Sequence, residues 1–306
     1  MNRSTVTFTS EGLNCVGWLY MPSHAIEQQV PAIVMAHGFS LVKEAYLDRY
    51  AEVFCQGGFA VLVFDYRNFG ESDSYLPQHL EPYEQIKDYR NAISWLSTLP
   101  EIDENNIGIW GTSYSGGHVL HIGAVDRRVK AVVAQVPTIN GRKGAERKMG
   151  HEKLEQFLKN LTNYRTERYV TGERKMYPVV AEDGAAAQPH PDAYKWFTET
   201  TKTVAPSWKN EITLESMEHY VEYNPASFIE FISPTPLMMI AAMDDGITPP
   251  DLIIEAFEEQ AKEPKKLLKL PRGHFDVYNG ATFEQASKES LKWFQQHLLT
   301  KQNSKV

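Results

Sequence analysis

Short hydrophobic runs alternate with segments of helical periodicity along the first half of the chain. Four runs that are almost entirely apolar occupy residues 31–37, 60–64, 107–111 and 129–135. Runs of this kind are typical of parallel strands buried on both faces. Three segments in which apolar residues recur every three or four positions occupy residues 43–56, 82–96 and 114–125. Because strand and helix alternate, we predict a mostly parallel central sheet with helices on both faces, preceded by strands at 5–9 and 14–20.

The alternation stops near Pro137. From there to about Ser233, charged and helical segments prevail, and no buried strand is expected. Four later segments resume the pattern of strand and helix, at residues 236–242, 250–261, 266–270 and 283–300. We therefore predict an α/β core formed by residues 1–137 and 233–306, with residues 138–232 inserted as a helical cap.

Composition limits the classes of protein that need to be considered. A chain of 306 residues can bury a large core, and its net charge of −8 argues against a nucleic-acid surface. The first residues lack the apolar core of a signal peptide, and no apolar run approaches the length of a membrane span. Cys15 and Cys55 have no metal-binding spacing and are interpreted as small buried residues. We expect a cytoplasmic protein without a membrane partner.

Ser113 lies at the junction between a predicted strand and a predicted helix. Its neighbours Gly111, Ser115, Gly116 and Gly117 are small, so strand and helix can approach closely around a tight turn. The helix N-terminus would direct N–H groups and partial positive charge toward the serine, as an anionic tetrahedral intermediate requires. This is the arrangement of a nucleophile elbow, although Ser115 replaces the second glycine of G-x-S-x-G. The alternative is a turn that only packs tightly or holds a phosphate.

A serine nucleophile needs a base and an acid, and both can be placed after later strands. His274 directly follows the last predicted strand and is the candidate base. Asp244 and Asp245 follow the preceding strand and compete for the role of the acid that orients the histidine. We choose Asp245 because it precedes Pro249 by four residues after a short turn.

The remaining parts of such a site would come from loops and from the inserted segment. The Tyr114 N–H follows the nucleophile and the Phe39 N–H follows the third strand, so these two groups are the candidates for an oxyanion hole. Residues 65–67 are expected to organise the neighbouring loop. In the cap, Trp196 and Phe197 are the candidate substrate-binding residues that roof an apolar pocket, and the charged stretch 165–175 is interpreted as a solvated face.

The order Ser113, Asp245, His274, together with the His37-Gly38 loop, resembles the α/β-hydrolase superfamily over residues 14–136 and 234–299. The motifs around these three residues are also similar to the serine-nucleophile branch of dienelactone-hydrolase-like and polyketide-thiohydrolase-like proteins. Dienelactone hydrolases themselves use cysteine, so Ser113 argues against a lactone substrate and leaves the fold unaffected.

The resemblance implies an α/β-hydrolase fold and a serine hydrolase that cleaves a small-molecule carboxylic ester or thioester through an acyl-enzyme, with no metal or organic cofactor. One alternative is an acyltransferase or peptidase that uses the same three residues. A second alternative is a non-catalytic binding protein on a hydrolase scaffold. No nucleic-acid or membrane partner is expected, and a homodimer is left open.

Overall fold

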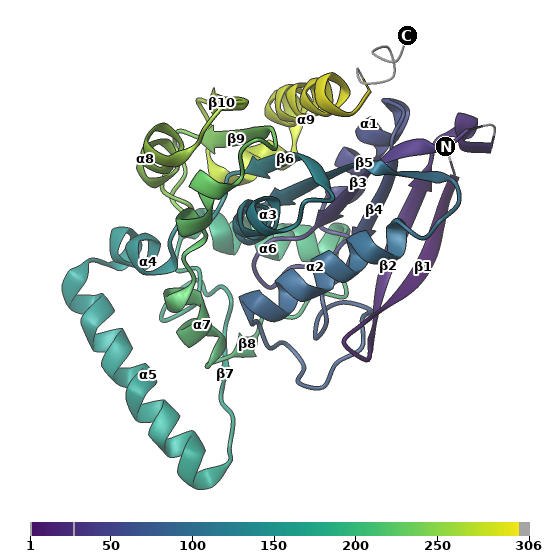
Figure 1. The fold of residues 1–306 in the computed structure, drawn as a ribbon. Helices are drawn as coiled ribbons and strands as arrows, with labels where there is room; N and C mark the ends of the chain where they lie inside the picture. The colour runs from purple at the N-terminus through teal and green to yellow at the C-terminus, as the bar shows by residue number, and fades with distance from the viewer. Residues whose placement is uncertain (1, 27, 300–306) are drawn as a thin grey trace.

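The computed structural model describes residues 2–26 and 28–299, which are arranged around an eight-stranded sheet (Figure 1). The strand order is β1-β2-β4-β3-β5-β6-β9-β10. The first two strands and the β2–β4 pair are antiparallel, and every other neighbouring pair is parallel. The strands are β1 (Asn2–Ser10), β2 (Leu13–Met21), β3 (Val30–Ala36), β4 (Ala60–Phe64), β5 (Ile102–Thr112), β6 (Val129–Gln135), β9 (Leu237–Ala242) and β10 (Lys265–Leu270).

Helices cover both faces of this sheet. They are α1 (Leu47–Gln56), α2 (Pro82–Leu96), α3 (Tyr114–Val125), α8 (Pro250–Gln260) and α9 (Gly280–Phe294), which continues into a π-helical turn, η4 (Gln295–Leu299). Helices α1 and α9 contact each other on one face, while α2 and α3 contact each other on the opposite face (Figure 1). Every residue of β3, β4 and β9 is buried, as two-sided coverage requires. The predicted fold class is confirmed, and Thr300 of the last predicted helix lies outside the described residues.

Helix α1 begins later than its periodicity predicts. The sequence pattern starts at Lys43, but Tyr46 adopts a left-handed conformation with φ 63°, so the helix begins at Leu47. The residues before Tyr46 belong to a loop instead of the helix, because the Lys43 N–H donates a hydrogen bond to the Asp65 carboxylate at 2.7 Å. The apolar spacing predicted the helix, but the contact between Lys43 and Asp65 determines where it starts.

The segment between β6 and β9 forms a separate group of elements. They are α4 (Gly141–Met149), α5 (His151–Thr171), β7 (Met176–Tyr177), α6 (Pro191–Thr203), β8 (Ile212–Thr213), α7 (Ser216–Glu222) and the 3-10 helix η2 (Pro225–Phe231). Helix α5 reaches away from the sheet (Figure 1). The expectation of no buried strand here was wrong, because β7 and β8 pair and both residues of β8 are buried. Two-residue strands are too short to produce an alternating pattern in the sequence.

The charged stretch 165–175 is only partly a solvated face. Lys175 pairs with Glu167 at the surface, as expected. Arg168 and Arg174, however, both bind Glu215, whose side chain is buried at the start of α7. Because a buried carboxylate needs such partners, these two arginines help to hold α7 against α5. No helix among the described residues is long and apolar enough to cross a membrane.

The parallel topology brings the predicted polar residues to one edge of the sheet. His37, Asp65, Ser113, Asp245 and His274 each follow the carboxyl end of a different strand. In an open α/β sheet, this edge is where ligands bind. The fold therefore gathers residues that are far apart in sequence, and their side-chain geometry determines whether they form a site.

Candidate active site

Ser113 occupies a strained turn between β5 and α3. Its backbone has φ 57° and ψ −115°, a region that residues other than glycine rarely adopt. Two backbone hydrogen bonds fix it there, from Ser113 N–H to the Gln135 carbonyl at 2.8 Å and from Thr138 N–H to the Ser113 carbonyl at 2.9 Å. A Cβ atom on Gly111 would lie 2.2 Å from the Ser115 carbonyl oxygen, so position 111 has no room for a side chain. The sequence predicted this small-residue turn, and the strained serine is what it produces.

The three residues predicted to act together form one hydrogen-bonded chain. His274 Nε2 lies 3.1 Å from Ser113 Oγ, and His274 Nδ1 lies 2.6 Å from Asp245 Oδ2. All three residues are buried, with exposed fractions of 8% for Ser113, 4% for His274 and 6% for Asp245. Asp244 is exposed, and its N–H donates to the Arg272 carbonyl. Of the two competing carboxylates, the structure brings Asp245 to the histidine.

The Asp245 carboxylate is held in its ionised form. Its Oδ1 accepts hydrogen bonds from the Ile247 and Thr248 N–H groups at 2.7 and 2.8 Å, and Thr248 Oγ1 contacts Oδ2 at 2.8 Å. Burial alone would raise the pKa of Asp245, but His274 and the hydrogen bonds from Thr248 outweigh it and lower the pKa. The site therefore places a fixed negative charge against one nitrogen of His274. Sequence reasoning missed Thr248, although a threonine three residues after an aspartate is a common local partner.

The two N–H groups predicted to stabilise an oxyanion lie beside Ser113. Within residues 2–26 and 28–299, neither the Phe39 N–H nor the Tyr114 N–H meets an acceptor. Tyr114 is the first residue of α3, where an N–H has no intrahelical partner. A Cβ on Gly38 would lie 3.1 Å from Ser113 Cβ, so the loop that carries Phe39 contacts the serine directly.

Tyr220, on α7, covers both of these candidate residues. Its ring lies 6.0 Å from the Tyr114 ring in a stacked arrangement and 5.6 Å from the Phe39 ring edge to face. The inserted segment therefore reaches the serine turn through Tyr220, and its buried Tyr223 also packs on Tyr114, with ring centroids 5.1 Å apart. No sequence signal distinguishes Tyr220 from other aromatic residues of the segment, because its position depends on how α7 packs.

Trp196 and Phe197, the predicted substrate-binding residues, lie on α6 near the histidine. Trp196 stacks on Phe275 with ring centroids 4.7 Å apart, and the Phe275 ring is 4.9 Å from that of His274. Phe197 contacts the same Phe275 ring at 6.1 Å. Their exposed fractions are 9% and 3%, so in this structure both rings are packed against the residue that follows the histidine.

His37 is buried beside the serine turn and stays neutral. Its Nδ1–H donates to the Gly38 carbonyl at 3.0 Å, and its Nε2 accepts from the Tyr66 N–H at 3.4 Å. Burial lowers the pKa of His37 to about 4. The ring has a hydrogen-bond partner on each nitrogen, and it shapes the loop that carries Phe39.

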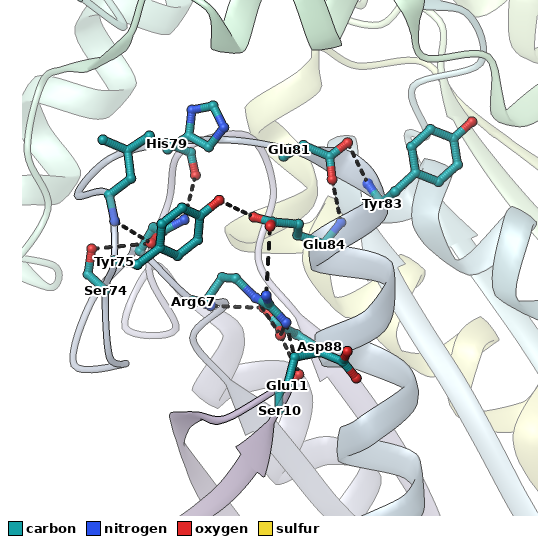
Figure 2. Close-up of polar contacts among 12 residues, drawn as sticks. Ser10, Glu11, Arg67, Ser74, Tyr75, His79, Glu81, Tyr83, Glu84 and Asp88 are labelled. Carbon is teal, nitrogen blue, oxygen red and sulfur yellow. Dashed lines mark hydrogen bonds and ion pairs between the residues drawn. The ribbon is translucent and has the colours of Figure 1, made fainter. Parts of the chain in front are cut away.

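Arg67 holds the neighbouring loop through hydrogen bonds to α2 and to the end of β1. Figure 2 shows its guanidinium directed at Asp88 on α2 and at Ser10 at the end of β1. The bond from Arg67 Nη2 to Asp88 Oδ1 is 2.6 Å, and a second bond reaches Ser10 Oγ at 3.2 Å. Farther along the same loop, Tyr75 donates to Glu84 at 2.8 Å (Figure 2). These contacts support the prediction that residues 65–67 organise a loop.

Lys43 is a fully buried cation that anchors the loop carrying Phe39. Its Nζ lies 2.8 Å from Asp65 Oδ2 and also binds Glu71 and Glu44. Burial alone would lower the pKa of Lys43, but the surrounding carboxylates outweigh it and raise the pKa. The same three carboxylates are the group among the described residues that could hold a metal ion. Because the ammonium already neutralises them, we interpret the cluster as an ion-pair network.

Removing the Lys43 charge should destabilise the protein. Lys43→Met leaves the buried Asp65 carboxylate without its cation, which should lower the free energy of unfolding by roughly 3–5 kcal/mol. Urea denaturation measures this loss. The double variant Lys43→Met/Asp65→Asn should recover part of it, because the uncompensated charge is gone. An equal loss in the single and double variants would contradict the assignment of an ion pair.

Comparison with known proteins gives the family. The model of the X-Pro dipeptidyl-peptidase (S15) family matches residues 16–276. Thiohydrolase aneE of Aspergillus aculeatus is 30% identical, over 96% of this chain and 92% of its own. Polyketide transferase grgF of a Penicillium species is 30% identical over 97% of both chains. The crystal structure of GrgF, called an alpha/beta hydrolase, covers 98% of this chain with a TM-score of 0.83, and that of DcsB with a substrate analogue covers 97% with a TM-score of 0.84.

The chain belongs to the X-Pro dipeptidyl-peptidase (S15) family within the α/β-hydrolase superfamily. It is an enzyme, a hydrolase or acyltransferase of that fold. The predicted superfamily is therefore confirmed, and a non-catalytic scaffold is not supported.

Proposed function

We propose that the protein is a serine hydrolase that cleaves a carboxylic ester or thioester through an acyl-enzyme. The observation that carries this proposal is the continuous hydrogen-bonded chain from Ser113 Oγ through His274 to the Asp245 carboxylate. A serine hydroxyl is a weak nucleophile at neutral pH, and a histidine within hydrogen-bond reach activates it. The ionised Asp245 keeps the proton of His274 on Nδ1, so that Nε2 faces the serine as an acceptor.

Acylation follows from this geometry. Ser113 Oγ attacks the carbonyl carbon while His274 Nε2 takes the hydroxyl proton. The carbonyl oxygen becomes an oxyanion, which the N–H groups of Phe39 and Tyr114 would stabilise. As the tetrahedral intermediate collapses, His274 returns the proton to the leaving alcohol or thiol, and the acyl group stays on Ser113.

Deacylation repeats the steps with water in place of the serine. His274 takes a proton from the water, the water oxygen attacks the acyl carbon, and Ser113 leaves with the returned proton. The carboxylic acid is then released. These steps use side chains and backbone N–H groups alone.

The relatives support this class of bond and also raise an alternative. One relative is named a thiohydrolase, which supports thioester cleavage. Another is named a polyketide transferase, which supports transfer of the acyl group to an alcohol or amine in place of water. Both reactions pass through the same acyl-enzyme. The match to the X-Pro dipeptidyl-peptidase family makes cleavage of an amide bond a third reaction to test.

A substrate panel separates these reactions. We expect turnover of p-nitrophenyl butyrate and of the matching thioester, and no measurable cleavage of an Xaa-Pro-p-nitroanilide. Added glycerol or an amine would divert product from the acid to a new ester or amide if transfer dominates. Faster cleavage of the anilide than of both esters would overturn the proposal in favour of a peptidase.

We propose that residues 138–232 act as a cap and that α6 sets substrate choice. The Trp196 ring lies against Phe275, the neighbour of the histidine, so truncating it changes the volume close to the acyl carbon. Trp196→Ala and Phe197→Ala should each shift the preferred acyl chain length, changing KM between esters by about tenfold. Fluorophosphonate labelling of Ser113 should persist.

Kinetics on a series of p-nitrophenyl esters measures the shift, and thermal unfolding of each variant controls for lost packing. Trp208 contacts Phe197 at 5.1 Å, but among the described residues its ring does not contact Phe275, so Trp208→Ala is the matched variant and should shift the profile less. An unchanged profile for the two α6 variants would mean that the pocket is built elsewhere.

A further inference from the structure

A hollow of about 400 Å³ opens at the junction between the inserted segment and the core. Helix α4 forms one side, next to α7 and α8 (Figure 1). The residues that line it are Arg147, Lys148, Pro189 and His190 from the inserted segment, and Asp245, Gly246, Pro249, Pro250 and Asp251 from the core. Because ligand sites often lie between such units, the hollow is a candidate ligand site next to Asp245 of the hydrogen-bonded chain.

Lys148 is the unusual cation of this hollow. It is half-buried, and its Nζ donates to Tyr220 Oη at 3.1 Å and to the buried Gln188 Oε1 at 3.2 Å. Among the described residues, no carboxylate lies within ion-pair distance of it. Arg147, one residue earlier, differs because its Nε pairs with Asp251 at 3.1 Å. A half-buried ammonium with neutral partners alone has lost hydration without gaining a counter-charge, which leaves it able to take an anion.

Contacts connect this ammonium to the serine turn. Tyr220, whose hydroxyl Lys148 contacts, packs its ring against both Phe39 and Tyr114. One tyrosine side chain therefore separates the Lys148 ammonium from the residues proposed to hold the oxyanion. Asp245, the partner of His274, also lines the hollow.

The other charges around the hollow leave room for an anion. The Asp245 carboxylate is turned inward to His274 and to the N–H groups of Ile247 and Thr248. Asp251 is neutralised by Arg147. Lys148 is therefore the cation of this wall that has no carboxylate partner among the described residues.

We propose that Lys148 binds an anionic group of the substrate, a carboxylate or phosphate, placed away from the carbonyl that Ser113 attacks. This proposal rests on the hydrolase function argued above and narrows it to esters or thioesters that carry a negative charge. The charge can belong to the acyl chain or to the leaving group. The shared chemistry is an oxyanion that accepts hydrogen bonds from the ammonium.

Two matched pairs of probes test the proposal. For the acyl side, p-nitrophenyl hemiglutarate is compared with neutral p-nitrophenyl valerate. For the leaving-group side, S-acetyl phosphopantetheine is compared with neutral S-acetyl pantetheine. Each pair is measured on the wild type, Lys148→Met, Lys148→Arg and Lys153→Met, which removes an exposed lysine of the neighbouring α5.

We expect the wild type to prefer the anionic member in one pair. Lys148→Met should lower kcat/KM for that probe by about tenfold and for its neutral partner by less than twofold, with Lys148→Arg retaining the preference. Lys153→Met should behave as wild type. The proposal is overturned if neither anionic probe is preferred. It is also overturned if Lys148→Met lowers kcat/KM equally for both members of a pair, because Lys148 would then act only by holding Tyr220 in place. Failure of the proposed hydrolase function would be recognised separately. In that case the wild-type protein would neither turn over neutral esters nor react with a fluorophosphonate.

Discussion

Replacing Ser113 with alanine is expected to lower kcat for a simple ester by roughly a millionfold. Ser113 Oγ is the hydroxyl that His274 Nε2 contacts, at 3.1 Å, so the variant has no activated nucleophile. The backbone N–H groups of Phe39 and Tyr114 remain, and they leave a small residual rate. Initial rates with p-nitrophenyl butyrate measure the loss, with the variant and wild type compared at matched folding by circular dichroism.

Ser115 supplies the matched control for this experiment. It lies two residues away in the same turn, but its Oγ is bonded to the Tyr66 hydroxyl at 2.7 Å and does not contact His274. Ser115→Ala should lose some stability, because a buried hydroxyl loses its partner, and should keep most of its turnover. Equal losses in the two variants would show that the turn, and not the Ser113 hydroxyl, is what the activity needs.

The second large effect concerns Asp245. Asparagine at this position would keep its carbonyl oxygen toward the Ile247 and Thr248 N–H groups and turn its NH₂ toward His274 Nδ1. Two donors cannot face each other, so His274 would carry its proton on Nε2, where it cannot accept the serine proton. Asp245→Asn should therefore lower kcat by a factor on the order of 10³ to 10⁴, as in other wrong-tautomer variants.

Asp244→Asn is the control for this change. Asp244 is exposed. Its backbone N–H donates a hydrogen bond to the Arg272 carbonyl, and the substitution leaves this bond in place. We expect kcat to change by less than a few fold, measured in the same ester assay with thermal unfolding in parallel. A larger loss for Asp244→Asn than for Asp245→Asn at intact folding would reverse the assignment.

The sequence carried the information for this site because each candidate lies shortly after a predicted strand. The apolar runs that end before Ser113 and Asp245 are strong patterns, the lysine-containing strand before His274 is a weaker one, and parallel strands bring their carboxyl ends to one edge. The small residues around Ser113 predicted the tight turn independently. Fold class and candidate residues therefore followed from local patterns and one topological rule.

The parts that the sequence could not predict depend on tertiary packing. Tyr220 and Lys148 belong to helices whose own patterns give no sign that they meet beside Ser113. The pairing of Lys43 with Asp65 joins the loops after two different strands, and no spacing rule connects them. The two-residue pairing of β7 and β8 produces no periodicity at all.

The central claim is that the acyl group is carried covalently by Ser113. Mass spectrometry of enzyme that is quenched with acid within milliseconds of mixing with p-nitrophenyl butyrate tests this claim most directly. We predict a mass increase equal to one butyryl group, which peptide mapping locates on Ser113 and which is absent from Ser113→Ala. An adduct on another residue, or turnover without any adduct on Ser113 under conditions that trap the acyl-enzyme of a known serine esterase, would contradict the account.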